Sequence, residues 1–164
     1  MKILLKYIWR EVFDYYANRS VDDLRLEIQQ LFNRQGANFS INLTGKFISE
    51  YEFEMTPKWQ FIMIRNYENE IAYLKGRIFQ DKEQKTRATF TVRPNSIFLI
   101  FFFIFPIIGI LVLSKSGQNY KDTLAAYLFI IAVPLIVLAF GYFAKQGIKN
   151  RFIATFNLRP YNEV

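Results

Sequence analysis

Three glutamates at alternate positions are the residues whose types and spacing come closest to a chemical site. Glu50, Glu52 and Glu54 would share one face of a β-strand, where alternate side chains repeat at about 6.6 Å. Carboxylates at that spacing could bind a cation or a basic partner segment, and a carboxylate pair is also what glycosidases use. Nothing nearby suggests a sugar cleft, so a solvated outer face is the simpler interpretation.

The composition removes most other catalytic chemistries. The chain has no cysteine and no histidine, which excludes disulfides, c-type haem attachment and the usual zinc or nucleophile systems. The seven glycines are scattered and form no phosphate-binding loop. We therefore expect a protein that is not an enzyme and has no cofactor or metal. A membrane enzyme that uses carboxylates alone is a weaker alternative.

Two long uncharged runs must position everything else. They cover residues 97–113 and 123–144, with the polar segment 114–122 between them. A helix needs about 17–25 apolar residues to cross a bilayer, so these runs predict a transmembrane helical hairpin within residues 96–144. Neither run contains an acidic or a basic residue, which argues against a proton or ion pathway.

The charges around the hairpin predict its orientation. Basic residues cluster on its outer sides and are sparse in its loop, so the positive-inside rule places both termini in the cytoplasm. The N-terminal segment does not look like a signal peptide, because charges interrupt its apolar stretch. We expect a multi-pass protein of a cell membrane, most simply a bacterial inner membrane. The outer basic residues are Lys82, Lys85, Arg87, Arg93, Lys145, Lys149, Arg151 and Arg159, against Lys115 and Lys121 in the loop.

Residues 1–95 are predicted to form one cytoplasmic α+β domain. Ser20 and Asp23 resemble a capping box that opens a helix, which Gly36 would end. Residues 1–19 fit an interfacial helix, a helix packed on the core, or a first strand. Alternating polarity then predicts an antiparallel meander of about five strands. Its segments are 39–55, broken near Ser49, followed by 59–64, 71–79 and 86–92. The expected fold class is thus an α+β membrane protein with N-terminal helices, this meander, and a two-helix transmembrane hairpin.

Residues 145–164 are predicted to form a cytoplasmic C-terminal segment. Within it, 150–158 fits a strand or a helix that continues from the second span. We favour the helix, because a continuous span needs no new turn. A strand that returned to the sheet would make the hairpin an insertion within the soluble domain.

Several basic residues are candidates for contact with lipid headgroups. Lys75, Arg77, Arg87 and Arg93 take outward positions on two strands that should be neighbours, and each contributes on the order of 1 kcal/mol of attraction near anionic lipids. Simple compliance with the positive-inside rule explains them equally well. Nucleic-acid binding is disfavoured, because the net charge of +7 coincides with the membrane flanks. The same headgroup role is expected for Lys145, Lys149 and Arg151.

Small residues in the two runs predict close helix packing. Ala125, Ala132 and Ala139 repeat every seven residues, and Gly109 could meet them from the first span. Packing within the hairpin is the simplest interpretation, and a homo-oligomer or another membrane protein partner is the alternative. Pro106 and Pro134 near the span centres would shape that packing.

Two functions follow as hypotheses. The first is a non-enzymatic scaffold, adaptor or lipid-surface binding module held on the membrane by its hairpin. The second is a ligand-gated effector whose β domain binds a small anionic nucleotide and whose hairpin oligomerises. The order of a β domain and two spans resembles small anchored bacterial proteins and, in architecture alone, phage-defence effectors in which a domain that binds a cyclic nucleotide is joined to membrane helices.

Overall fold

The computed structural model describes residues 10–33, 43–57, 72–115 and 120–160. The chain forms two compact units. The sheet unit comprises Met1–Pro94 together with Ala144–Val164, and the hairpin unit comprises Asn95–Phe143. The predicted C-terminal segment therefore belongs to the same unit as the N-terminal domain, and the hairpin is inserted within that unit.

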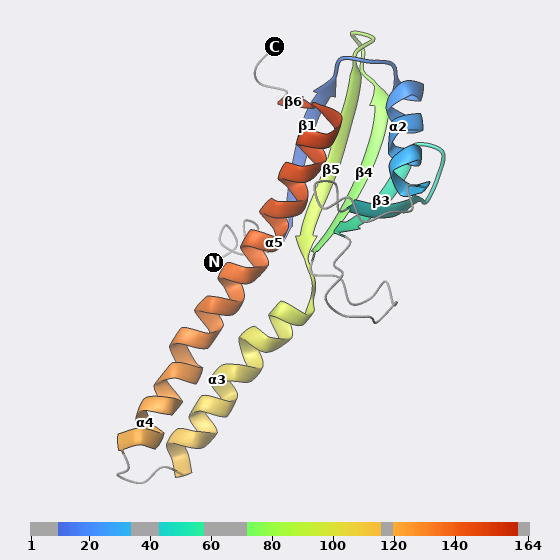
Figure 1. Cartoon of the computed structure of the whole chain (residues 1–164). Helices are drawn as coiled ribbons and strands as arrows, with labels where there is room; N and C mark the ends of the chain where they lie inside the picture. Colours follow the sequence, from blue (N-terminus) through green and yellow to red (C-terminus); the bar gives the residue numbers. More distant parts are fainter. Residues whose placement is uncertain (1–9, 34–42, 58–71, 116–119, 161–164) are drawn as a thin grey trace. The chain divides into compact units, whose positions relative to one another are not determined.

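The sheet unit contains a six-stranded antiparallel sheet in the order β2-β3-β4-β5-β1-β6 (Figure 1). The α+β class and the antiparallel sheet are confirmed, and the described residues contribute six strands to a sheet predicted with about five. Within the segment 1–19, the described part forms a strand that pairs with β5 and β6, so the prediction of a helix there is wrong. Residues 1–9 and the predicted strand 59–64 lie outside the described residues. The strands are β1 (Glu11–Ala17), β2 (Leu43–Phe47), β3 (Glu52–Pro57), β4 (Ala72–Gln80), β5 (Thr86–Pro94) and β6 (Arg159–Pro160).

The helix predicted after Ser20 is confirmed as α2 (Val21–Asn33). The Ser20 hydroxyl accepts a hydrogen bond from the Asp23 backbone N–H at 3.1 Å and donates one to the Asp23 carboxylate at 2.6 Å, which caps the first turn. Leu24 and Ile28, four residues apart, are fully buried. The apolar stripe of α2 therefore packs on the sheet core.

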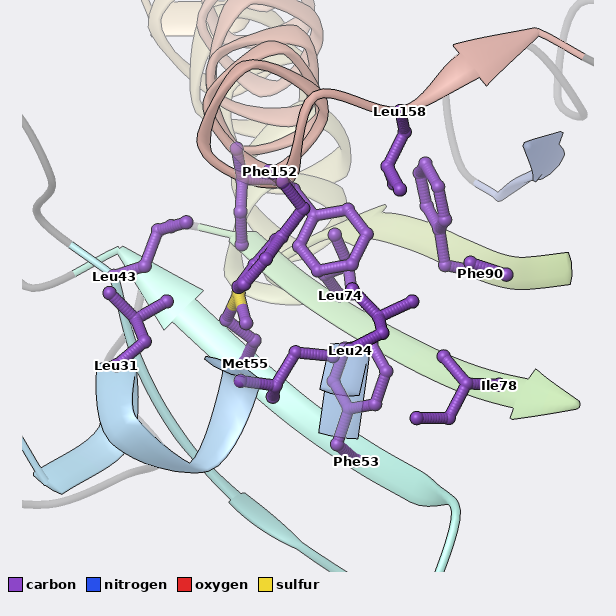
Figure 2. Packing of buried hydrophobic residues seen from close by; sticks show 14 of the residues in the cluster. Leu24, Leu31, Leu43, Phe53, Met55, Leu74, Ile78, Phe90, Phe152 and Leu158 are labelled. Atoms are coloured by element: carbon purple, nitrogen blue, oxygen red, sulfur yellow. The ribbon is translucent and has the colours of Figure 1, made fainter. Parts of the chain in front are cut away.

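The end of α5 (Val133–Phe156) packs in the same core. The Phe152 ring centroid lies 5.6 Å from that of Phe53 on β3 and 5.0 Å from that of Phe90 on β5. Figure 2 shows these side chains gathered with residues of α2 and β4. The helix predicted at 150–158 is thus confirmed as far as Phe156, and the residues after it return to the sheet.

The helix α5 ends in a Schellman motif. Asn157 adopts a positive φ of 46°, a conformation that asparagine tolerates better than most residues. The backbone N–H of Leu158 donates to the Ile153 carbonyl, and that of Asn157 donates to the Ala154 carbonyl. Arg19 adds a hydrogen bond of 2.6 Å to the Phe156 carbonyl. These bonds turn the chain so that β6 can pair with β1.

Among the residues that the structure describes, two helices are long and apolar enough to cross a membrane. The first is α3 (Ile97–Lys115), and the second begins with α4 (Tyr120–Tyr127), passes through a π-helical turn, η2 (Leu128–Ala132), and continues into α5. The Val133 N–H donates to the Leu128 carbonyl, five residues back. Pro134 follows directly. It has no backbone N–H to donate, and its ring would clash with the carbonyl of the preceding turn in a regular α-helix, so the wider π-helical turn lies where that clash would occur.

Gly109 lies where α3 closely approaches the second helix. A Cβ added to Gly109 would lie 2.6 Å from the Ile130 Cγ1 atom and 2.8 Å from the Ala126 carbonyl oxygen. Both distances are well below ordinary van der Waals contact. Glycine therefore permits the close approach of α3 to the second helix.

We expect Gly109→Leu to destabilise the hairpin by about 1–3 kcal/mol, because the larger side chain must push the helices apart. The measurement is the midpoint of unfolding when sodium dodecyl sulfate is titrated into the protein in mild detergent. Ile110→Leu is the control, since Ile110 is exposed on the same helix. Equal midpoints for the two variants would contradict the packing at Gly109.

Candidate functional site

The alternation of β4 and β5 places four predicted basic residues on the sheet face opposite the core. Ala72, Leu74, Gly76 and Ile78 are buried on β4, and the intervening side chains point the other way. The two strands are neighbours, as predicted. We call this surface the charged face, defined by Tyr73, Lys75, Arg77 and Phe79 of β4, Arg87, Thr89 and Arg93 of β5, Asp14 and Tyr16 of β1, and Glu52 and Glu54 of β3.

The basic residues of the charged face are spread along the strands. Arg93 and Arg87 are six residues apart on β5, which corresponds to about 20 Å. The Debye length at physiological ionic strength is only about 8 Å. Arg87 and Arg93 therefore act separately, whereas Lys75 and Arg77 lie between them and are two residues apart on β4, within about one Debye length of each other.

Two of the glutamates that could do chemistry lie on this same face. Glu52 is opposite Arg77 in the strand register, and Glu54 is opposite Lys75. Glu50 precedes the strand, and its backbone carbonyl accepts a hydrogen bond from the Arg25 side chain. The three carboxylates do not form one row, and no metal-binding cluster of acidic residues occurs in the described part of the chain.

Arg87 is the centre of a polar network on the charged face. Its guanidinium lies 3.2 Å from the Asp14 carboxylate and 3.9 Å from that of Asp81. The Tyr16 hydroxyl donates to Asp81 at 3.2 Å, and the Thr89 hydroxyl donates to Asp14. The network ties β1 to the turn after β4, so it gives Arg87 a structural task within the sheet.

The same network stabilises the charged form of Asp81. The backbone N–H of Lys82 donates to its carboxylate at 2.7 Å and is the main reason that the pKa of Asp81 is lowered. The Tyr16 hydroxyl and the Arg87 charge lower this pKa further. No motif in the sequence predicts this role for Asp14, Tyr16 or Asp81, although Asp14 and Tyr16 alternate as a strand requires.

Of the three headgroup candidates predicted after the second span, only Arg151 is exposed. Lys145 is fully buried, and its ammonium lies 2.7 Å from the Glu11 carboxylate of β1. The reason is helical spacing, because Lys145 shares a face with Ile148 and Phe152, which pack in the core. Lys145 has no exposed surface for a headgroup, contrary to the expected role. The Lys149 ammonium lies 3.7 Å from the centroid of the Phe13 ring.

The predicted packing residues are distributed over the hairpin unit. Gly109 is buried against Ala126 and Ile130. Ala125 and Ala132 are half-buried, and Ala139 is exposed. The contact at Gly109 therefore uses Ala126 rather than the alanine stripe.

An open pocket of about 300 Å³ lies where β4 extends beyond the start of β3. Asp22 and Arg77 bring opposite charges to it, and Tyr51 contributes a hydroxyl. The neighbouring Glu50 carboxylate is the main cause of a raised pKa for Tyr51, so this hydroxyl stays protonated. The charged side chains among the described lining residues are one acidic and one basic, Asp22 and Arg77, so the pocket favours no single ligand class.

No family model matches this chain, and neither the curated proteins nor the solved structures contain a match.

Proposed function

We propose that this protein is an integral membrane protein with two spans, which holds an α+β module at the membrane surface and acts without catalysis. Its role would be that of a scaffold, adaptor or lipid-surface binding module. We further propose a cytoplasmic side for both termini, as the basic flanks indicate.

One observation carries the proposal. The large apolar side chains of the hairpin unit face outward instead of forming a core. Phe103 on α3 and Phe143 on α5 are 60% and 69% exposed. A soluble domain rarely leaves such a continuous apolar surface uncovered, whereas lipid would cover it. Because the hairpin is inserted within the sheet unit, the module would be attached to the membrane at two points of the chain, after Pro94 and before Ala144.

The headgroup candidates become a smaller set. Lys75, Arg77, Arg93 and Arg151 have exposed side chains and are the residues that we propose for contact with anionic lipids. Glutamates on β3 lie opposite Lys75 and Arg77 and partly offset their positive charges. We therefore expect Arg93 and Arg151 to contribute most of the attraction to anionic lipids.

Resistance to alkaline carbonate extraction tests the membrane anchor. We expect the protein to remain in the membrane pellet and Ile107→Arg to reduce that fraction, because arginine at a span centre costs about 2.5–3.5 kcal/mol. Ile107 is exposed at mid-helix, and Ile107→Leu is the matched control. Full release of the unmodified protein would overturn the proposal.

The ligand-gated effector remains the second candidate. The feature that favours it is the alanine stripe, which the contact at Gly109 leaves unused. Native mass spectrometry from mild detergent separates the candidates: a monomer that carries only lipid supports the scaffold, and an oligomer that Ala132→Leu dissociates supports the effector.

A further inference from the structure

A second pocket lies at the C-terminal end of β1, where Tyr16 marks the edge of the charged face. Its volume is about 180 Å³, and its lining combines the end of β1 with the start of β5 and with β6. The lining residues are Tyr16, Ala17, Asn18, Lys85 and Arg159.

The strand register brings the cations of this pocket together. Arg159 on β6 is directly opposite Tyr16, and the Lys85 ammonium lies 5.8 Å from the centroid of the Tyr16 ring. Residues opposite each other on adjacent strands have Cβ atoms about 4.5–5.5 Å apart. The two cationic side chains therefore flank one tyrosine at the rim of one small cavity.

The described residues of the lining, within 10–33, 72–115 and 120–160, bring two positive charges and no carboxylate. Glu83 pairs with Lys85 at 3.1 Å, but both side chains are largely exposed, and surface pairs of that kind are weak and exchangeable. The nearby Asp81 is engaged by Arg87 and by the Tyr16 hydroxyl. Among the described residues, no ion pair is formed by Arg159. The groups that can still donate to a ligand are the Lys85 ammonium, the Arg159 guanidinium and the Asn18 amide.

This donor set and volume fit one chemical group. Guanidinium and ammonium groups together form charge-assisted hydrogen bonds with phosphate oxygens. Drug-sized ligands occupy about 300–1,000 Å³, so the smaller cavity suits a single phosphoryl group or the phosphorylated end of a larger molecule.

The position within the sheet unit indicates the source of that group. The pocket borders Thr86, at one end of β5, whereas Pro94 ends the same strand just before α3. Nine residues of strand correspond to about 27 Å between these ends, which is several Debye lengths. The pocket is therefore remote from the residue at which the chain leaves the sheet for the hairpin.

We propose that Lys85, Arg159 and Asn18 form a binding site for the phosphoryl group of a soluble molecule. The site does not depend on whether the protein acts as a scaffold or as an effector, because it concerns only the sheet unit. Membrane anchoring by the hairpin does not require such a ligand.

The test uses the full chain in non-ionic detergent, with inorganic phosphate and pyrophosphate as probes and chloride at matched ionic strength as the reference. Phenylglyoxal modifies exposed arginines, and mass spectrometry reports the extent at each one. We expect phosphate to slow the modification of Arg159 and to leave Arg151 unaffected. Calorimetric titration of pyrophosphate should show binding that Arg159→Gln and Lys85→Gln each weaken about tenfold, as expected for the loss of a charge-assisted hydrogen bond, while Arg151→Gln binds normally.

Two results would overturn the proposal. The first is equal modification of Arg159 in phosphate and in chloride, together with no heat of pyrophosphate binding. The second is protection of Arg159 by nanodiscs that contain phosphatidylglycerol when soluble phosphate gives none, because the anion would then be a lipid headgroup. Far-ultraviolet circular dichroism of each variant verifies that its fold is retained.

Discussion

Replacing Glu11 with glutamine is expected to lower the free energy of unfolding of the sheet unit by about 3–5 kcal/mol, because it removes a carboxylate from a buried charge. Lys145 is 0% exposed, and its ammonium lies 2.7 Å from the Glu11 carboxylate. Glutamine keeps the size and a hydrogen-bond acceptor but not the negative charge. Chemical unfolding in mild detergent, followed by circular dichroism, measures the change.

Two further variants make the result specific. Glu54→Gln removes an exposed carboxylate of the charged face and is expected to change stability by less than about 0.5 kcal/mol. Combining Glu11→Leu with Lys145→Met should recover most of the loss, because apolar side chains of similar volume often replace a buried ion pair without cost. A Glu11→Gln protein as stable as the unmodified one would show that the pair contributes nothing.

Phe152→Ala is the second change with a large expected effect, about 3–5 kcal/mol of lost stability. Its ring contacts Phe53 and Phe90 on the sheet and lies 5.0 Å from Phe156, measured between centroids. Removing the ring leaves a cavity among side chains that come from α5 and the sheet. The same unfolding measurement applies.

Phe143→Ala is the matched control on the same helix, since its ring is 69% exposed. It should leave the unfolding of the sheet unit unchanged. Equal stability of the two variants would mean that the end of α5 does not complete the core.

Local patterns were enough to predict several elements. The capping residues Ser20 and Asp23 are close in sequence, and they correctly predicted the start of α2. Alternation predicted β4 and β5, because each strand has one buried face. The two apolar runs predicted two long helices by length alone.

Long-range packing decided the rest. Nothing local indicates that β1 pairs with both β5 and β6, because those partners lie more than 60 residues away. Lys145 looked like one more flanking cation, and only its register with Ile148 and Phe152 on α5 shows that it is buried. The Arg87 network was missed for the same reason, since Asp14, Asp81 and Arg87 come from separate elements.

The insertion of the hairpin within the sheet unit has a consequence for protein synthesis. The ribosome completes Met1–Pro94 before either long helix, yet the core also requires Ile148, Phe152 and Phe156. Phe53 and Phe90 therefore lack the side chains of α5 that pack on them until both apolar helices have been translated. The sheet unit can complete its core only after the hairpin has been synthesised. A polypeptide that is interrupted within the hairpin would therefore expose an incomplete core to proteases and chaperones.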